Sequence, residues 1–190
     1  AAILKHFQRY SSIKDMATYD TLTGLYNRRY FEERLEVEAQ KSFYSGIPIS
    51  LVMVDIDFFK KVNDTFGHTE GDQVLSKISS LLKNSVRKKD TVARYGGEEF
   101  ILILPGTGLE ESFVIAERIR RLVENTLFEV GKAQLNLTLS MGISNFPSQR
   151  VKSKEELIGM ADQALYDAKR GGRNKVCIFA RKSSQWTVPT

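Results

Sequence analysis

The sequence has little of what disulfide-stabilised, zinc-binding and membrane-spanning proteins require. Cys177 is the single cysteine among 190 residues, which excludes an intramolecular disulfide and a zinc site built on a cluster of cysteines. It lies in the apolar segment KVCIFA, where we expect a buried and unreactive thiol. No apolar run approaches the ~20 residues of a membrane-spanning helix. The first residues, AAILKHFQRYSS, lack the continuous apolar core of a signal peptide.

The composition is ordinary for a soluble globular protein, with 42% hydrophobic and 27% charged residues. The net charge of +5 favours an anionic ligand such as a nucleotide. Basic residues are spread along the chain with only short local clusters, so we do not expect a nucleic-acid partner. The chain begins without methionine, and we expect it to be a fragment of a longer protein.

Apolar periodicity and turn signals predict one mixed domain at residues 20–181, preceded by a linker or signalling helix at 1–19 and followed by a tail at 182–190. The segment DTLTGLYNRR reads as an ordered loop. Helices are expected at about 28–43, at 58–67, around 74–86, after a capping box at 107–110 and after a second one at 153–156. Strands are expected at 47–57, on both sides of Gly96-Gly97, at 135–144 and at 175–180. Both a hairpin and crossover helices are present, which indicates an α+β fold with one sheet covered by helices.

The segment RYGGEEF, residues 94–100, places two carboxylates next to two glycines. Adjacent glycines between strand-like runs predict a two-residue hairpin, because both central positions of its favoured turn need positive φ. The simpler interpretation is a hairpin tip with solvated acids. The alternative is a metal or phosphate site, where Gly96 and Gly97 let a ligand approach the backbone.

Asp55 ends an apolar run that reads as a buried central strand. A carboxylate there is costly unless it is paired or holds a cation. An aspartate that caps the next helix is the alternative, although Asp57 suits that role better. We expect Glu98 to be the first residue of the return strand, so that either Glu98 or Glu99 meets Asp55, because adjacent strand residues point to opposite faces. The set of ligands would be all oxygen, which favours Mg²⁺ or Mn²⁺ and indicates phosphoryl or nucleotidyl transfer.

Two further clusters carry polar groups at expected turns. Asn63, His68 and Asp72 surround Gly67 and Gly71. An asparagine with an aspartate can form hydrogen bonds to the edge of a purine base. The same residue types are also common at the ends of helices, which is the simpler interpretation.

Lys169 and Arg173 flank two glycines just after a predicted helix. As cations, they can either interact favourably with the dipole at the C-terminal end of that helix or bind a triphosphate.

Four stretches in order resemble the GGDEF-domain family of diguanylate cyclases: DTLTGLYNRR, DIDFFKKVNDTFGHTEGDQVL, RYGGEEF and ADQALYDAKRGGRNKV. The resemblance covers about residues 20–180, with glutamate at the third position of the signature. It implies a palm like that of nucleotidyl cyclases and some polymerases, with a central antiparallel-mixed sheet flanked by helices. It also implies condensation of two GTP into cyclic di-GMP and two pyrophosphates, with one GTP on each subunit of a homodimer.

The resemblance also implies roles for individual residues. Asp55, Glu98 and the Ile56 carbonyl resemble metal ligands, Glu98 is also a candidate base for the attacking 3′-hydroxyl, and Glu99 resembles a supporting acid. Asn63 and Asp72 resemble guanine-reading residues, with His68 a nearby substrate contact. The positions similar to phosphate-binding ones are Phe58, Phe59, Lys60, Lys169 and Arg173, and Gly96 and Gly97 leave room for the nucleotide.

Arg87 and Asp90 form an Arg-x-x-Asp placed just before the signature. In the family this spacing resembles an inhibitory site for the product, with Arg118 similar to its second arginine. The simpler interpretation is a solvated helix end.

Two rival functions use the same residues: a catalytically silent receptor for cyclic di-GMP, and a GTP-sensing domain that regulates a neighbour. The receptor would be favoured by loss of Asp55 or Glu98, and both residues are present. We further expect a location in the cytosol, and a sensor or regulatory region before residue 1 of the fragment.

Overall fold

The computed structural model describes residues 18–147 and 153–179. The helix expected at 1–19 falls outside these residues except for its last two positions, and the expected tail at 182–190 falls outside entirely. The helices are α2 (Arg28–Ser45), α3 (Phe59–Phe66), α4 (His68–Asn84), α5 (Leu109–Glu124) and α6 (Lys154–Arg170). The strands are β1 (Ile49–Ile56), β2 (Thr91–Gly96), β3 (Glu99–Pro105), β4 (Leu127–Val130), β5 (Ala133–Asn136), β6 (Leu139–Phe146) and β7 (Val176–Ile178).

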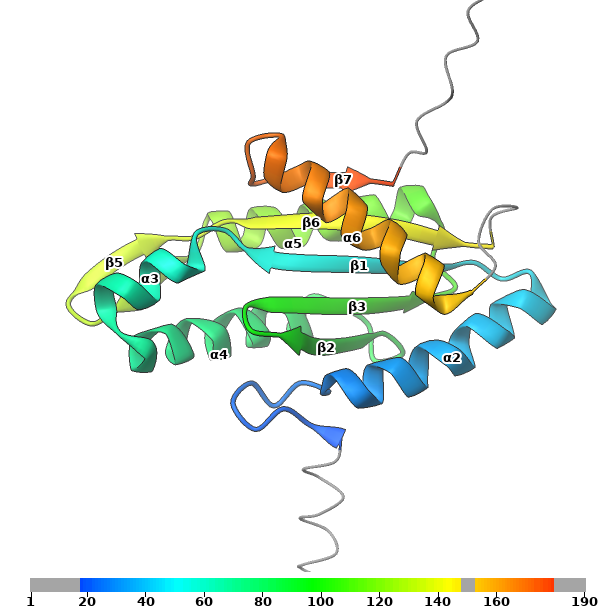
Figure 1. Cartoon of the computed structure of the whole chain (residues 1–190), viewed down its shortest axis with the longest axis horizontal. Helices are drawn as coiled ribbons and strands as arrows, with labels where there is room; N and C mark the ends of the chain where they lie inside the picture. The colour runs from blue at the N-terminus through cyan, green and yellow to red at the C-terminus, as the bar shows by residue number, and fades with distance from the viewer. Residues whose placement is uncertain (1–17, 148–152, 180–190) are drawn as a thin grey trace, which may run out of the picture.

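A five-stranded sheet in the order β2-β3-β1-β6-β7 forms the centre of the domain (Figure 1). β1 pairs antiparallel with both β3 and β6, whereas β7 pairs parallel with β6. All eight residues of β1 are buried, as expected for an apolar strand covered on both faces. The parallel pairing follows from α6, which carries the chain back across the sheet between β6 and β7.

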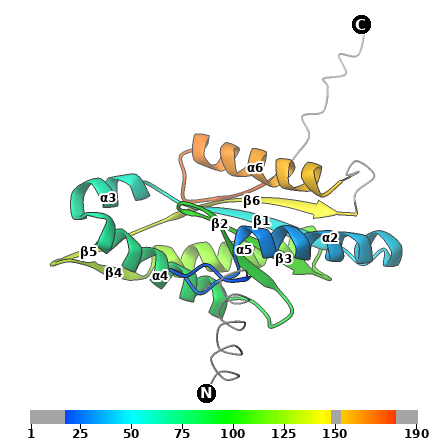
Figure 2. The same cartoon turned by 60° about the horizontal axis from the view of Figure 1, so that its bottom comes forward.

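Helices cover both faces of this sheet. The helices α2 and α6 lie on one face and α4 and α5 on the other (Figure 2). One core cluster lies between the sheet and the pair α2 and α6, and the other lies between the sheet and the pair α4 and α5. The structure therefore confirms the predicted α+β fold with a mixed central sheet flanked by helices. Within the described ranges, no helix combines the length and apolar character that crossing a bilayer requires.

The contact between α6 and β6 is unusually close because β6 carries a glycine at the crossing point. A Cβ built on Gly142 would lie 2.1 Å from the backbone nitrogen of Leu165 and 2.2 Å from the carbonyl oxygen of Ala161. These are main-chain atoms of a helix, so they cannot move aside singly. Glycine thus allows α6 to lie directly on the sheet, and α6 carries Lys169 at its far end.

The strand expected at 135–144 is divided in the structure. Residues 133–136 form β5, which pairs with β4 in a separate two-stranded sheet, and β6 begins only at Leu139. The short β4–β5 hairpin was not predicted. The continuous alternation of LNLTLS hides the break, because Leu135, Leu137 and Leu139 remain in contact with the same apolar core on both sides of it.

The capping box expected at 107–110 is also wrong. The N-cap of α5 is Gly108, without a side-chain hydrogen bond. The backbone of Thr107 is held at the start of β1, because its N–H donates to the Pro48 carbonyl and its carbonyl accepts from the Ser50 hydroxyl. At the second predicted box the N-cap is confirmed, since the Ser153 hydroxyl accepts from the Glu156 N–H at 3.2 Å.

The close approach at Gly142 predicts a large difference between two glycine substitutions. Gly142→Ala should destabilise the domain by about 3 kcal/mol, because the added methyl forces backbone atoms apart. Gly159→Ala is the matched control: Gly159 lies inside α6, and an added Cβ would have no atom within 4 Å, so alanine should stabilise by about 0.5–1 kcal/mol. Urea unfolding of both variants measures the difference, and equal stabilities would contradict the packing described.

Candidate active site

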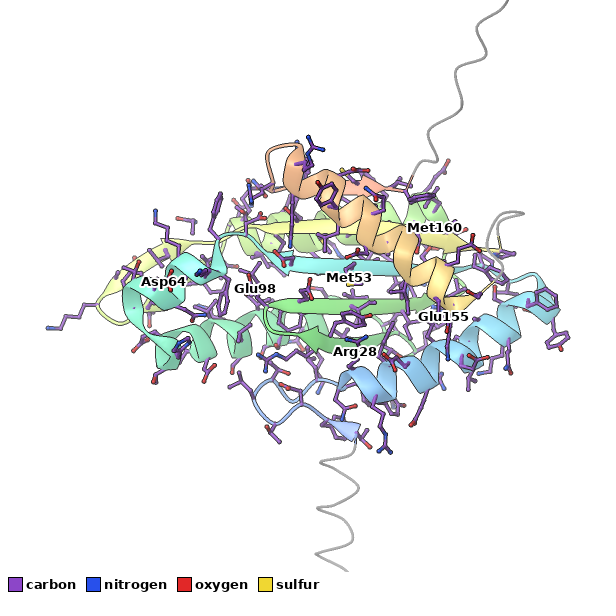
Figure 3. All side chains as sticks on the ribbon, in the orientation of Figure 1. Arg28, Met53, Asp64, Glu98, Glu155 and Met160 are labelled. Atoms are coloured by element: carbon purple, nitrogen blue, oxygen red, sulfur yellow. The ribbon has the colours of Figure 1, made fainter. Side chains whose placement is uncertain are left out.

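Most of the predicted catalytic residues meet at one end of the sheet. There β1 ends at Ile56, the β2–β3 turn folds back, α3 leaves the sheet and α6 ends. Figure 3 shows Glu98 at that turn, on the side of the domain where α3, which carries Asp64, projects. Strand ends next to crossover connections commonly bind ligands in open sheets.

Asp55 is a buried carboxylate whose charge is matched by a lysine from α6. Its side chain is 7% exposed, and Oδ2 lies 2.7 Å from the Nζ of Lys169. Burial raises the pKa of Asp55 above its ordinary value, the Lys169 ammonium opposes that shift, and the Asp57 carboxylate adds to it. The predicted phosphate-binding lysine is therefore in direct contact with the predicted metal ligand.

The hairpin differs from prediction by one residue. A bulge between Arg94 and Gly96 shifts the register, so Gly96 pairs with Glu99 and the turn residues are Gly97 and Glu98. Glu98 is therefore not the first residue of the return strand. Only Gly97, with φ of 43°, has the positive φ that was expected of both glycines.

The same two charged groups, the Asp55 carboxylate and the Lys169 ammonium, act on both glutamates of the signature. Glu99 pairs directly with Asp55 across the sheet, and Glu98 precedes it in the turn. Burial raises the pKa of both glutamates, the Asp55 carboxylate raises it further, and Lys169 opposes the rise. Both acids, rather than one of the two, therefore lie within electrostatic reach of Asp55, and each is more easily protonated than a free glutamate.

Arg94, to which sequence reasoning assigned no role, holds the hairpin turn. Its Nε and Nη2 donate to the Gly97 carbonyl at 3.0 and 2.8 Å, and its Nη1 lies 3.3 Å from Asp20. Burial raises the pKa of Asp20, but hydrogen bonds from Thr23 together with Arg94 bring it below its usual value. The same loop adds a short bridge to the sheet, because Tyr26 pairs with Ala93 at the edge of β2. The predicted loop DTLTGLYNRR is thus ordered around the hairpin.

The N-terminus of α3 faces the same region. No side chain caps it, and its N-cap residue Phe58 has φ of 59° and an exposed ring. The guanidinium of Arg173 lies 4.6 Å from the centre of that ring. Phe59 is buried in the core, so only its backbone N–H is available to an anion, whereas Lys60 is exposed. An uncapped helix start beside an arginine suits a phosphate group.

The predicted guanine-reading residues lie at the junction of α3 and α4. A Cβ at Gly71 would lie 1.9 Å from the Oδ1 of Asn63, so glycine at this position is what allows the asparagine side chain to lie against α4. Asp72 is the next residue of that helix and is exposed, as is His68 at its start. Gly71 itself lies inside α4, which corrects the expectation of a turn there.

Asp57 does not cap α3, contrary to prediction. It is buried, and it accepts hydrogen bonds from the hydroxyls of Thr138 and Ser140, both at 2.7 Å, and from the backbone N–H of Asn174 at 3.0 Å. Its partners lie 81 to 117 residues away in sequence, so no local pattern could have indicated them.

A scan against family models matches residues 17–175 to the diguanylate cyclase GGDEF domain. The match covers most of the chain and contains every site residue described above. The chain belongs to the GGDEF-domain family.

Solved and curated GGDEF proteins agree with this assignment. The response regulator PleD of Caulobacter vibrioides is 44% identical over 85% of this chain and 36% of its own length. Diguanylate cyclase A of Treponema denticola is 39% identical over 88% of this chain and 46% of its own. A crystal structure of the coiled coil and GGDEF domain of DgcB from Caulobacter crescentus, in complex with c-di-GMP, has a TM-score of 0.86 at 31% identity, covering 93% of both chains. The chain spans less than half the length of these two curated relatives.

The second predicted site of this GGDEF domain is a cavity of about 530 Å³ between the end of α4 and α5. It brings together Arg87, Asp90 and Arg118, which sequence reasoning had grouped. The Arg87 N–H donates to Asp90 Oδ2 at 2.8 Å, and Arg87 Nη2 forms an ion pair with Glu111 at 2.6 Å. Arg87 and Asp90 lie beyond the end of α4 in a turn, not on a solvated helix end. Burial raises the pKa of Asp90.

Among the described residues, no group of three His, Cys, Asp or Glu side chains is arranged to hold a metal ion. The donor chemistry nevertheless fits Mg²⁺, which proteins usually bind through one or two carboxylates together with substrate phosphates. Asp55 and Glu98, with the Ile56 carbonyl, would supply the protein's share of such ligands.

The crowded carboxylates predict that removing one of them stabilises the metal-free domain. The pKa of Glu98 is higher in the folded than in the unfolded state. The free energy of unfolding therefore falls as the pH rises from the unfolded-state pKa to the folded-state pKa, and at any higher pH the ionised carboxylate opposes folding. Glu98→Gln should therefore raise Tm by about 1–3 °C at pH 7.5 without divalent metal. Glu129→Gln, an exposed carboxylate on β4, is the control and should leave Tm unchanged. A lower Tm for Glu98→Gln would refute the electrostatic account.

Proposed function

We propose that this domain is a diguanylate cyclase that condenses two GTP molecules into cyclic di-GMP with release of two pyrophosphates. The observation that supports this most is the convergence of Asp55, Glu98 and Glu99 with Lys169 at one end of the sheet. An all-oxygen acidic cluster bordered by cations is suited to binding a nucleoside triphosphate and transferring its α-phosphoryl group.

In each half-reaction the 3′-oxygen of one GTP forms a bond to the α-phosphorus of the other, and the bond to pyrophosphate breaks. Glu98 would accept the proton of the 3′-hydroxyl, a role favoured by its raised pKa. Asn63 and Asp72 would orient the guanine. Lys169, Arg173 and the start of α3 would bind the triphosphate. A bound divalent cation would neutralise charge on the phosphates and carboxylates.

Two bound GTP molecules must meet, so the reaction requires a homodimer whose subunits each present one nucleotide. The exposure of the hairpin turn supports a reaction between two subunits. Gly96 and Gly97 are exposed, so a second subunit can approach the half-buried carboxylates beside them. We also propose that a preceding sensor or regulatory region sets the geometry of this dimer, and that the domain works in the cytosol.

The cavity at Arg87 supports feedback inhibition by the product. Two arginines and an aspartate around a cavity of about 530 Å³ suit a ligand with both phosphates and guanine edges. Asp90 strengthens this proposal, since its Oδ1 is buried without a hydrogen-bond partner among the described residues, and a guanine could donate to it.

Turnover distinguishes this function from a silent receptor and from a GTP-sensing domain. With GTP and Mg²⁺ the parent should form cyclic di-GMP and pyrophosphate in a 1:2 ratio. Glu98→Gln should slow this at least about 100-fold, because the base and a metal ligand are lost, while Glu129→Gln should not. Product can be measured by chromatography at high protein concentration. GTP binding without any product would overturn the proposed activity.

Removing the inhibitory site should separate inhibition from catalysis. Arg87→Ala should raise the cyclic di-GMP concentration needed for half-inhibition about tenfold or more, because a charge-assisted contact is lost. Its rate without product should remain that of the parent. Lys88→Ala, one residue further along the exposed turn and outside the cavity lining, controls for a general loss of positive charge. Unchanged inhibition in Arg87→Ala would exclude this cavity as the product site.

A further inference from the structure

The loop after α6 has an unusual backbone where it reaches the site. Among the described residues, the non-glycine residues with positive φ are Phe58, Arg173 and Asn174, at 59°, 62° and 47°. Phe58 and Arg173 are in contact through the ring and the guanidinium, so all three lie at one place. Backbone of this kind persists only where surrounding contacts hold it, and such positions cluster at functional sites.

Asn174 is the residue that these contacts hold. Its backbone N–H donates to Asp57 Oδ2 at 3.0 Å, on the sheet side. Its side-chain Oδ1 accepts from Arg120 Nη1 and its Nδ2 donates to Glu124 Oε1, both at 2.6 Å, on the α5 side. Both the oxygen and the nitrogen of the side-chain amide are thus hydrogen-bonded. These bonds fix the orientation of the amide and leave the loop little freedom at this residue.

The α5 half of this arrangement is itself held by ion pairs. Arg120 is 9% exposed and is paired with Glu117 at 2.7 Å and with Glu124 at 2.9 Å. The hydrogen bond from Asn174, followed by that from Arg120, lowers the pKa of Glu124, so Glu124 stays ionised at neutral pH. A buried arginine between two carboxylates is a firm anchor, because the arginine would lose both ion pairs if it moved.

We propose that Asn174 is a positioning residue, which uses Arg120 and Glu124 of α5 to hold Arg173 where it meets the triphosphate of the substrate. Arg173 is the neighbouring residue, and its own N–H is fixed to the end of α6 through the Ala168 carbonyl at 3.0 Å. With both sides of Arg173 anchored, its left-handed backbone directs the side chain towards Phe58 and the uncapped start of α3. This inference rests on the proposed function, since it assigns Arg173 to the phosphates.

The proposal predicts an effect on triphosphate binding rather than on folding alone. Asn174→Gly keeps the positive φ, which glycine adopts freely, and keeps the N–H that binds Asp57, but it removes the amide. Glu124→Ala removes the acceptor from α5 and leaves the loop sequence intact. Each variant should weaken binding of the triphosphate about three- to tenfold, the size of one or two hydrogen bonds. Arg121→Ala is the matched control, because Arg121 is exposed on the same helix and pairs with Glu117.

The measurement is the Kd, in the presence of Mg²⁺, of a GTP analogue with a methylene group between its α and β phosphorus atoms, which cannot be turned over. Each substitution is also combined with Arg173→Ala. If Asn174 acts through Arg173, Asn174→Gly and Glu124→Ala should have no further effect once Arg173 is alanine. Steady-state kinetics should show the same change in KM for GTP with a smaller change in kcat.

The outcomes separate this inference from the proposed function. Parent-like binding by Asn174→Gly or by Glu124→Ala, while Arg173→Ala binds weakly, would overturn the positioning role and leave the proposed function standing. Equal losses with and without Arg173 would also overturn it, since Asn174 would then act on the fold as a whole. A parent protein that does not bind the analogue at all would overturn the proposed function itself. If Asn174→Gly does not fold, Glu124→Ala decides the question.

Discussion

The ion pair between Asp55 and Lys169 is the interaction on which the rest of the site depends. A carboxylate at the end of a fully buried strand would be protonated or displaced if no cation met it. The cation comes from α6, and α6 can reach the strand end only because Gly142 lets the helix lie directly on β6. One packing contact in the middle of the sheet therefore determines whether a charge is matched at its end.

Binding elements around this ion pair are held by residues that do not themselves face a ligand. Arg94 fixes the carbonyl of Gly97 in the turn that carries Glu98, and Gly71 leaves the space in which Asn63 lies. Asp57 connects β1 to the strand β6 and to the loop after α6. The hairpin turn and the loop after α6 are thereby tied to neighbouring parts of the domain, and α3 is packed against α4, so that the site keeps a geometry that costs energy locally.

Much of this could be predicted from the sequence, and the failures have a common cause. The central strand and the long helices were correct, because apolar periodicity and local turn signals encode them. The grouping of Arg87, Asp90 and Arg118, which the family resemblance implied, agrees with the cavity that these residues line. The register of the hairpin was wrong by one residue, because a bulge leaves no mark in RYGGEEF. Asp57 and Asn174 were misassigned or missed, because their partners lie far away in the chain. Arg94 was missed because one partner, Asp20, lies 74 residues away and the other is the backbone carbonyl of Gly97, which no side-chain pattern marks. The family resemblance supplied candidate ligands, but it did not reveal what holds them.

The loop that carries Asp20 has a consequence of another kind. An open sheet exposes unpaired amide groups along its two outer strands, and other chains can add to them. Here Tyr26 pairs with Ala93 along part of β2, and β7 on the opposite side is only three residues long. The border of β2 is therefore interrupted near its middle, and the border of β7 is short. Interrupted and short borders disfavour the joining of sheets between molecules, which matters for a domain whose proposed chemistry brings two copies face to face.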